Sequence, residues 1–176
     1  VDNRQLIHYP AQWHVVIEAF QNLIISNHLK FDVIGGVAVG GVPHSSVVAY
    51  QTDTPSVFIR KEAKEHGKGK RIEGGDVSGK TVLLLEDLVT TGGSSLSGVE
   101  ALREAGATVV DMIAIVSYGF SEANQNFSDA DVNLHTLTNF SIIMDIALSE
   151  NRFTPEEAHM IEEWFENPHH WKDKYA

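Results

Sequence analysis

The chain has 176 residues, 43% of them hydrophobic, and a formal net charge of -11 at pH 7. The acidic balance disfavours nucleic acid and anionic membranes as partners, and the apolar runs are too short to span a bilayer. The absence of cysteine excludes disulfides, thiolate metal sites and cysteine catalysis, and it suits a cytoplasmic location. Length and apolar content predict a single globular domain over residues 1–176.

The first half of the chain alternates helical and strand-like segments. Pro10 suits the first turn of a helix, because apolar residues then recur at helical spacing. A buried strand at residues 31–34 is expected to break at Gly35 and Gly36. Residues 61–75 lack apolar periodicity and are dense in charge and glycine, which predicts a mobile, functional loop. The other elements predicted here are a helix at 43–50 and strands at 56–60 and 81–86.

The second half continues this alternation. Gly106 is expected to stop one helix, and the last helix begins with a capping box in which Thr154 and Glu157 satisfy each other's backbone N–H groups. The predicted elements are helices at 94–105, 122–129 and 140–149 and strands at 108–116 and 132–137. Strands that alternate with helices predict an α/β fold with a mainly parallel central sheet flanked by helices.

Residues 81–94, TVLLLEDLVTTGGS, form the most informative segment. An apolar strand delivers Glu86 and Asp87 to a loop of small hydroxyl residues and glycines, and a helix follows. Carboxylates accept hydrogen bonds from sugar hydroxyls, whereas loop amides and a helix N-terminus hold phosphate. Ligands of parallel sheets bind at the carboxyl ends of the strands, where these acids would lie. The segment therefore predicts a sugar-phosphate site.

Other readings of the same segment fit less well. It is not a Walker loop, because no Gly-Lys-Ser/Thr follows. It is not a Rossmann fingerprint, because Gly-x-Gly-x-x-Gly is absent and acids precede the loop. A purely structural strand-to-helix turn explains the two glycines but not the acids and hydroxyls in the same order.

Residues 60–71 place six cationic side chains in an otherwise acidic chain. A solvated surface loop is the simplest interpretation of such a charge run. Gly67 and Gly69 on either side of Lys68 favour instead a loop that closes over a polyanion, where exclusion of water strengthens each charge contact.

The segment RKEAKEHG at residues 60–67, followed by EDLVTTGGS at 86–94, resembles orotate phosphoribosyltransferase, a type I phosphoribosyltransferase. In that family the first motif is the mobile catalytic loop and the second binds 5-phosphoribosyl-1-pyrophosphate (PRPP). The likeness spans essentially the whole chain, and residues 117–139 are similar to the shorter bacterial branch. Residues 36–43 resemble the family's short loop that contacts pyrophosphate.

The resemblance implies a role for each matching residue. Glu86 and Asp87 hold the ribose hydroxyls and are catalytic residues together with Lys64. Lys64 is the main catalytic side chain, as an electrostatic stabiliser or proton donor. Thr90 also contacts orotate. The implied PRPP-binding residues are Arg60, Lys61, Lys64, His66, Glu86, Asp87, Leu88, Val89, Thr90, Thr91, Gly92, Gly93 and Ser94.

The implied reaction transfers the phosphoribosyl group of PRPP to orotate, which gives orotidine 5-monophosphate and pyrophosphate in UMP synthesis. The leaving pyrophosphate develops negative charge, which cationic side chains stabilise. The resemblance implies Mg²⁺ carried by PRPP oxygens and water, with no protein metal ligands. It also implies a homodimer whose loop at residues 60–67 reaches the neighbouring subunit's site, with neither nucleic acid nor membrane as a partner.

The residues that contact the base are left unassigned, because the chain departs from the family's pattern at the positions concerned. Ser117 and Tyr118 stand where some relatives carry an Asp-Arg pair whose arginine anchors the orotate carboxylate. The family also has an N-terminal segment that covers the base, and since this chain starts at Val1 we expect that hood to be partly missing. Among the histidines, His44 beside the short loop is a minor site candidate and His135 is interpreted as structural.

Two alternatives stay open. The first is a phosphoribosyltransferase for another base, because the PRPP loop is shared across the superfamily; the motif at residues 60–67 favours orotate. The second is a PRPP-sensing regulator on the same fold that binds RNA, which requires a local basic face to overcome the net charge of -11.

Overall fold

The structure is a computed structural model that describes residues 1–62, 71–166 and 168. Contacts divide the chain into two compact units, Val1–Asn139 and Phe140–Ala176. The single domain expected over residues 1–176 stays a prediction. None of the helices in the described ranges is long and apolar enough to cross a bilayer.

The first unit is built on a sheet of six strands in its described part, in the order β3-β2-β1-β4-β5-β6. All neighbouring pairs are parallel except β2 with β3. The mainly parallel α/β fold expected from the sequence is therefore confirmed. The strands are β1 (Val33–Val37), β2 (Ser56–Ile59), β3 (Ile72–Glu73), β4 (Val82–Val89), β5 (Asp111–Ser117) and β6 (Asn133–Asn139).

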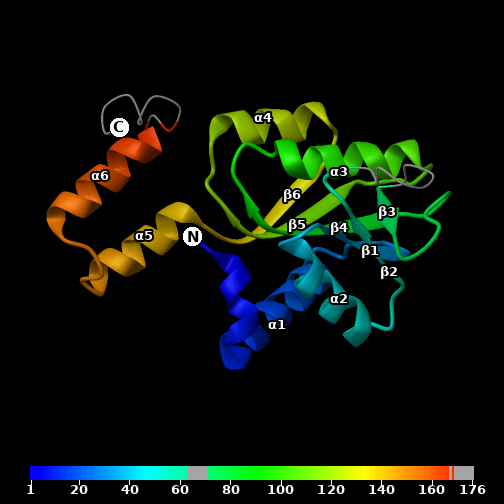
Figure 1. Ribbon diagram of the computed structural model, residues 1–176, viewed down its shortest axis with the longest axis horizontal. Helices are drawn as coiled ribbons and strands as arrows, with labels where there is room; N and C mark the ends of the chain where they lie inside the picture. Colours follow the sequence, from blue (N-terminus) through cyan, green and yellow to red (C-terminus); the bar gives the residue numbers. More distant parts are fainter. Residues whose placement is uncertain (63–70, 167, 169–176) are drawn as a thin grey trace. The chain divides into compact units, whose positions relative to one another are not determined.

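Helices cover both faces of this sheet (Figure 1). Two of them, α1 (Pro10–Ser26) and α2 (Gly41–Gln51), lie on one face, and α3 (Gly93–Glu104) and α4 (Ser121–Asp129) lie on the other. Leu84 and Met112 of the sheet pack with Val99, Leu102 and Phe127 on the α3 and α4 side. Side chains alternate along a strand, so the buried neighbours of Leu84 in β4 face α1 and α2.

Three local expectations differ from the structure, and one short helix is not predicted at all. β1 runs through Gly35 and Gly36 instead of breaking there. A Cβ at Gly35 would come within 3.1–3.2 Å of three packed side chains, so this glycine marks close packing in a central strand. β4 extends to Val89 and thus contains both acids, β3 forms inside the expected loop at 61–75, and a 3-10 helix, η1 (Asn3–His8), precedes α1.

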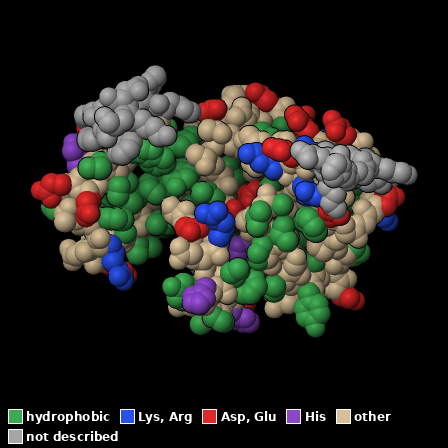
Figure 2. All heavy atoms as spheres, in the orientation of Figure 1, with side chains coloured by type: hydrophobic (Ala, Val, Ile, Leu, Met, Phe, Trp, Pro, Cys, Tyr) green, Lys and Arg blue, Asp and Glu red, His purple; other side chains and the backbone are tan. Residues whose placement is uncertain are grey.

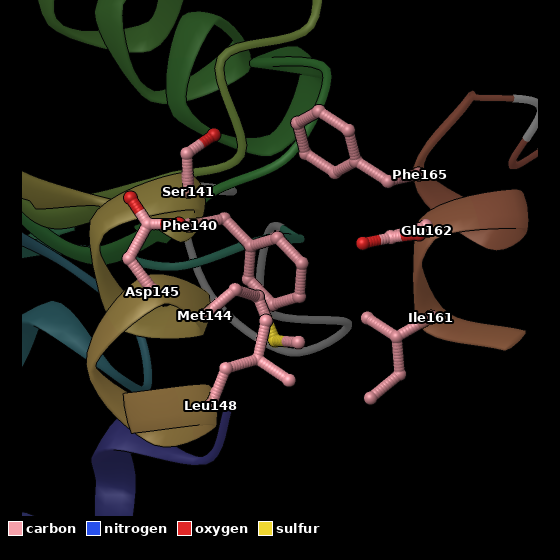
Figure 3. A pocket seen from close by; sticks show the side chains of 8 residues that line it. All are labelled: Phe140, Ser141, Met144, Asp145, Leu148, Ile161, Glu162 and Phe165. Carbon is pink, nitrogen blue, oxygen red and sulfur yellow. The ribbon is translucent and has the colours of Figure 1, made fainter. Parts of the chain in front are cut away.

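The second unit contains α5 (Phe140–Ser149) and α6 (Pro155–Glu166). The predicted capping box is confirmed, because the Thr154 N–H donates to the Glu157 carboxylate at 2.8 Å and the Glu157 N–H donates to Thr154 Oγ1 at 3.2 Å. A cavity of about 270 Å³ lies between the two helices, lined by Phe140, Met144, Leu148, Ile161 and Phe165 among others (Figure 3). Apolar side chains also gather over these helices on the surface (Figure 2).

Candidate active site

The strand order creates a switch point between β1 and β4. The chain proceeds from β1 to β2 on one side and from β4 to β5 on the other, so the crossover connections leave the adjacent strand ends in opposite directions. A cavity of about 350 Å³ opens at the carboxyl ends of these two strands. It is lined by Val1, Asp2, Asn3, Arg4, Ala38, Val39, Gly40, Glu86, Asp87, Leu88 and Ser94.

Glu86 is a buried acid at the bottom of this site, with only 5% of its surface exposed. Its carboxyl oxygen Oε1 accepts a hydrogen bond from the Asp87 backbone N–H at 3.0 Å. Burial raises the pKa of Glu86 to about 9, and hydrogen bonding with the Asp87 side chain adds to the rise. Glu86 is therefore protonated at neutral pH, and offers one O–H donor as well as an acceptor.

Asp87 lies half-buried against the loop that follows β1. A Cβ placed on Gly40 would collide with the Asp87 carboxylate, and one on Gly41 would collide with the Leu85 carbonyl oxygen. Glycine is thus required at position 41, where the obstacle is backbone, whereas a side chain at position 40 would displace the Asp87 carboxylate. The loop also contains a cis peptide bond between Ala38 and Val39.

The residues between β4 and α3 turn sharply at Gly92. Gly92 has φ +87°, a conformation that glycine adopts without strain, and a Cβ there would lie 2.8 Å from the Phe127 ring. The Asn126 side-chain amide donates to the Thr91 carbonyl oxygen at 3.0 Å and so fixes the turn. The first turn of α3 then presents backbone N–H groups without partners inside the helix. Such an arrangement binds anions.

The cations predicted for pyrophosphate are only partly described. Arg60 follows β2 and forms an ion pair with Glu73 at 3.6 Å, and Lys61 beside it is exposed. Neither contributes to the cavity at the switch point. Lys64 and His66 lie outside the described residues. Arg71 at the other end of the loop donates to the carbonyl oxygens of Arg60 at 2.9 Å and Ser97 at 3.0 Å, so it anchors the base of the loop.

Of the remaining predicted residues, Glu86, Asp87, Leu88 and Ser94 line the cavity together. The others in the segment, Val89, Thr90, Thr91, Gly92 and Gly93, form the end of β4, the turn and the start of α3 around it.

The amino-terminal segment also contributes to the site, which the sequence reasoning did not assign. Asn3 is 7% exposed, and its side-chain amide Nδ2 donates to the main-chain oxygen of Asp87 at 2.8 Å. The resemblance begins around Asp2, but no motif pointed to a contact with residues 84 positions further along the chain.

Tyr118 lies beside the end of β4, next to the segment that is predicted to bind PRPP. Its backbone N–H donates to the Val89 carbonyl oxygen at 3.0 Å, and its ring stacks on Phe120 with 5.7 Å between centroids. Burial raises the pKa of the Tyr118 hydroxyl. Elsewhere, His135 pairs with Asp111 at 2.9 Å near the amino-terminal edge of the sheet, in agreement with a structural role.

Comparisons with known proteins agree with the resemblance seen in the sequence. Residues 3–151 match the family described as phosphoribosyl transferase domain. Over 97% of this chain and 82% of the relative, the sequence is 43% identical to orotate phosphoribosyltransferase of Coxiella burnetii; the enzyme of the same name from Listeria monocytogenes is 41% identical over 97% and 81%.

The fold likewise matches a solved structure of orotate phosphoribosyltransferase from Aeropyrum pernix, with a TM-score of 0.75 and 26% identity over 82% of this chain and 81% of that one. These similarities, together with a cavity at the β1–β4 switch point that holds the paired acids and the start of α3, establish that the chain belongs to the phosphoribosyltransferase family and, within it, to the orotate phosphoribosyltransferases.

Proposed function

We propose that this chain transfers the phosphoribosyl group of PRPP to orotate, and so forms orotidine 5-monophosphate and pyrophosphate for pyrimidine synthesis. The observation that supports it best is the shared cavity of Glu86, Asp87 and Ser94 in a chain of this family. That cavity combines acids that can bind the ribose hydroxyls with a helix start that can bind the 5-phosphate, so it offers contacts to both parts of a ribose 5-phosphate.

In this proposal Asp87 and Glu86 bind the ribose 2- and 3-hydroxyls. Asp87 accepts their hydrogen bonds, whereas protonated Glu86 is able to donate as well as accept. The 5-phosphate binds to the segment from Thr90 to Ser94, where the start of α3 carries roughly half a positive charge. Leu88 and Val89 bring that segment to the sugar, and Thr90 contacts orotate.

The pyrophosphate group is assigned to the cations of the first motif, residues 60–67. Arg60, Lys61, Lys64 and His66 are proposed to bind it, with Lys64 as the main catalytic residue. As the bond from C1 to pyrophosphate breaks, positive charge grows on the ribose ring and negative charge on the leaving group. Cations close to that group stabilise the transition state more than the ground state. The negative charge of Asp87 lies on the sugar side, near the developing positive charge.

Mg²⁺ fits this site as a companion of the substrate. Within the described ranges, no three His, Asp or Glu side chains converge to hold a metal. Asp87 offers hard oxygen atoms in the cavity, but one carboxylate does not complete the coordination of Mg²⁺. An ion here would therefore be held mainly by PRPP oxygens and water, as is usual for Mg²⁺ with phosphates. When bound, the ion would neutralise charge on the leaving pyrophosphate.

The family resemblance also supports a homodimer in which the loop at residues 60–67 serves the neighbouring subunit's site. A cytoplasmic location is proposed with it, because a chain without cysteine suits a reducing compartment.

The direct test measures orotate consumption by its ultraviolet absorbance, with PRPP, Mg²⁺ and enzyme each omitted in turn. We expect the absorbance to fall only when all three are present. Consumption of another base but not orotate would indicate a different phosphoribosyltransferase. PRPP binding without consumption of any base, together with salt-dependent RNA binding, would favour the regulator instead.

A further inference from the structure

His44 is the one fully buried histidine of the described residues, at 0% exposure in the first turn of α2. The indole Nε1–H of Trp13 in α1 donates to its Nδ1 at 2.9 Å. Because Nδ1 acts as the acceptor, the ring proton of the neutral imidazole resides on Nε2. Burial lowers the pKa of His44, which keeps the ring neutral at physiological pH.

The Nε2–H of His44 is a buried donor without a partner. Polar atoms buried in this way are rare in folded proteins, because they lose their water without gaining a hydrogen bond. Trp13 and Phe20 place aromatic rings 6.2 Å from the His44 ring, measured between centroids, and offer Nε2 no acceptor. The unsatisfied donor therefore points to an acceptor that reaches Nε2 when the neighbouring cavity is occupied.

The helix geometry indicates which partner that is. Gly40 has helical φ and ψ of -64° and -39°, directly before α2, so Gly40 and His44 are related as positions i and i+4 on one face of the first turn. The carboxylate of Asp87 lies against Gly40 on that face. The negative charge of Asp87 also acts on the His44 ring, and it favours a donor directed toward it.

We propose that His44 is a positioning residue of the PRPP site, whose Nε2–H donates to the Asp87 carboxylate once a ribose ligand occupies the cavity. A carboxylate has about four acceptor sites, so this bond leaves sites free for two ribose hydroxyls. Trp13 fixes the tautomer that makes the donation possible. The inference rests on the proposed role of Asp87 in binding the ribose, and it extends that role to a residue that does not itself touch the substrate.

The kinetic test is a double-mutant cycle with His44→Phe and Asp87→Asn. His44→Phe retains the ring volume but removes the donor, and we expect kcat/KM for PRPP to fall roughly tenfold, as for loss of a hydrogen bond to a charged group. In the Asp87→Asn background the same change should cost clearly less, because the neutral amide oxygen is a weaker acceptor than the carboxylate. A full multiplicative loss in both backgrounds would show that His44 does not act through Asp87.

Two further variants separate positioning from packing. His44→Gln places an amide donor near the position of Nε2 and should recover part of the activity, whereas His44→Asn is too short to reach and should not. His135→Phe is the matched control, because it removes a half-buried histidine at the opposite edge of the sheet and should leave the PRPP kinetics unchanged. Equal losses for Gln and Asn would contradict the proposal.

A measurement on the wild-type protein avoids any dependence on the folding of variants. Nuclear magnetic resonance of the imidazole nitrogens should show the Nε2–H tautomer in the free protein, and PRPP with Mg²⁺ should shift the Nε2 proton strongly downfield as its hydrogen bond forms. An Nδ1–H tautomer, or an unchanged Nε2 proton at saturating PRPP, would overturn the inference. Absence of PRPP binding in the same titration would instead count against the proposed function.

Discussion

The side-chain amide of Asn3 donates to the main-chain oxygen of Asp87, and so ties the start of the chain to the acid at the end of β4 across 84 positions. Asn3 is almost completely buried by this contact. The bond holds the backbone of the residue whose carboxylate we assign to the ribose, and it closes one side of the cavity with the amino-terminal segment.

Asn3→Ala removes this donor and leaves the Asp87 carbonyl oxygen without it. We expect a loss of about 1 kcal/mol in the free energy of unfolding and a several-fold rise in KM for PRPP. Urea denaturation and steady-state kinetics measure the two effects. Gln5→Ala is the control, since it removes only an exposed hydrogen bond from the same 3-10 helix to the preceding residue, Asp2. Similar changes in both variants would rule out a specific role for the Asn3 contact.

Gly40→Ala tests the close approach of the short loop to Asp87. The added Cβ would collide with the carboxylate, so Asp87 must move, and kcat/KM for PRPP should fall by roughly tenfold or more. In the control Gly98→Ala, the added Cβ meets Val37, Ile59 and Leu84 at ordinary distances of 3.6–3.8 Å, so PRPP kinetics should match the wild type. Wild-type kinetics for Gly40→Ala would mean that the position of Asp87 is not critical.

The raised pKa of Glu86 predicts how the free energy of unfolding depends on pH. Its pKa is about 9 in the folded protein and near the ordinary 4.5 when unfolded, so between these values the folded state holds a proton that the unfolded state has lost. Stability therefore decreases as pH rises through this window, by up to about 1.4 kcal/mol per pH unit from this group. Below the window both states are protonated, and the contribution is constant.

Glu86→Gln removes this ionisation but keeps the oxygen that accepts from the Asp87 N–H. The variant and the wild type should unfold at similar urea concentrations near pH 5, and the variant should become the more stable of the two as pH approaches about 8.5. Glu100→Gln, at an exposed position of α3, is expected to retain the wild-type pH dependence. Parallel curves for Glu86→Gln and the wild type would show that Glu86 is ionised in the folded protein.

Lys64→Ala tests the catalytic assignment that rests on the family resemblance. We expect turnover to fall far more than PRPP affinity, because a charge contact that strengthens in the transition state affects mainly kcat. Stopped assays give kcat, and calorimetry gives the PRPP affinity. Unchanged turnover would remove Lys64 from the mechanism.

Mixed dimers test whether the loop is shared between subunits. Lys64→Ala and Asp87→Asn chains should each be nearly inactive alone, whereas hybrids carry one site in which both residues are intact and should regain part of the activity. If verified hybrids remain as inactive as the parents, each loop serves its own subunit.

Much of the fold follows from local patterns. Strands such as β2 and helices such as α5 appear near their predicted ranges, because apolar periodicity and turn residues act over a few positions. The capping box at Thr154 was predictable for the same reason. The motif from Glu86 to Ser94 is likewise contiguous in the chain, so its chemistry was visible before its geometry.

Other features depend on contacts between distant segments. The sequence predicts a break at the two glycines of β1, yet the strand is continuous. Gly35 packs tightly against side chains of β2 and β4, and Gly36 packs against the start of α2. Arg71 was one of six cations in a run, and the structure shows it bonded to two carbonyl oxygens at the base of that run.

The sequence by itself therefore determined the α/β class and the family, and it predicted the residues of the PRPP motif, since each is encoded by neighbours along the chain. Only the tertiary structure decided that β1 and β4 lie side by side, so that Gly40, Asp87 and Asn3 meet at one cavity. It also decided that His44 is buried with an unpaired donor. These features arise from packing between segments far apart in sequence, which local patterns do not specify.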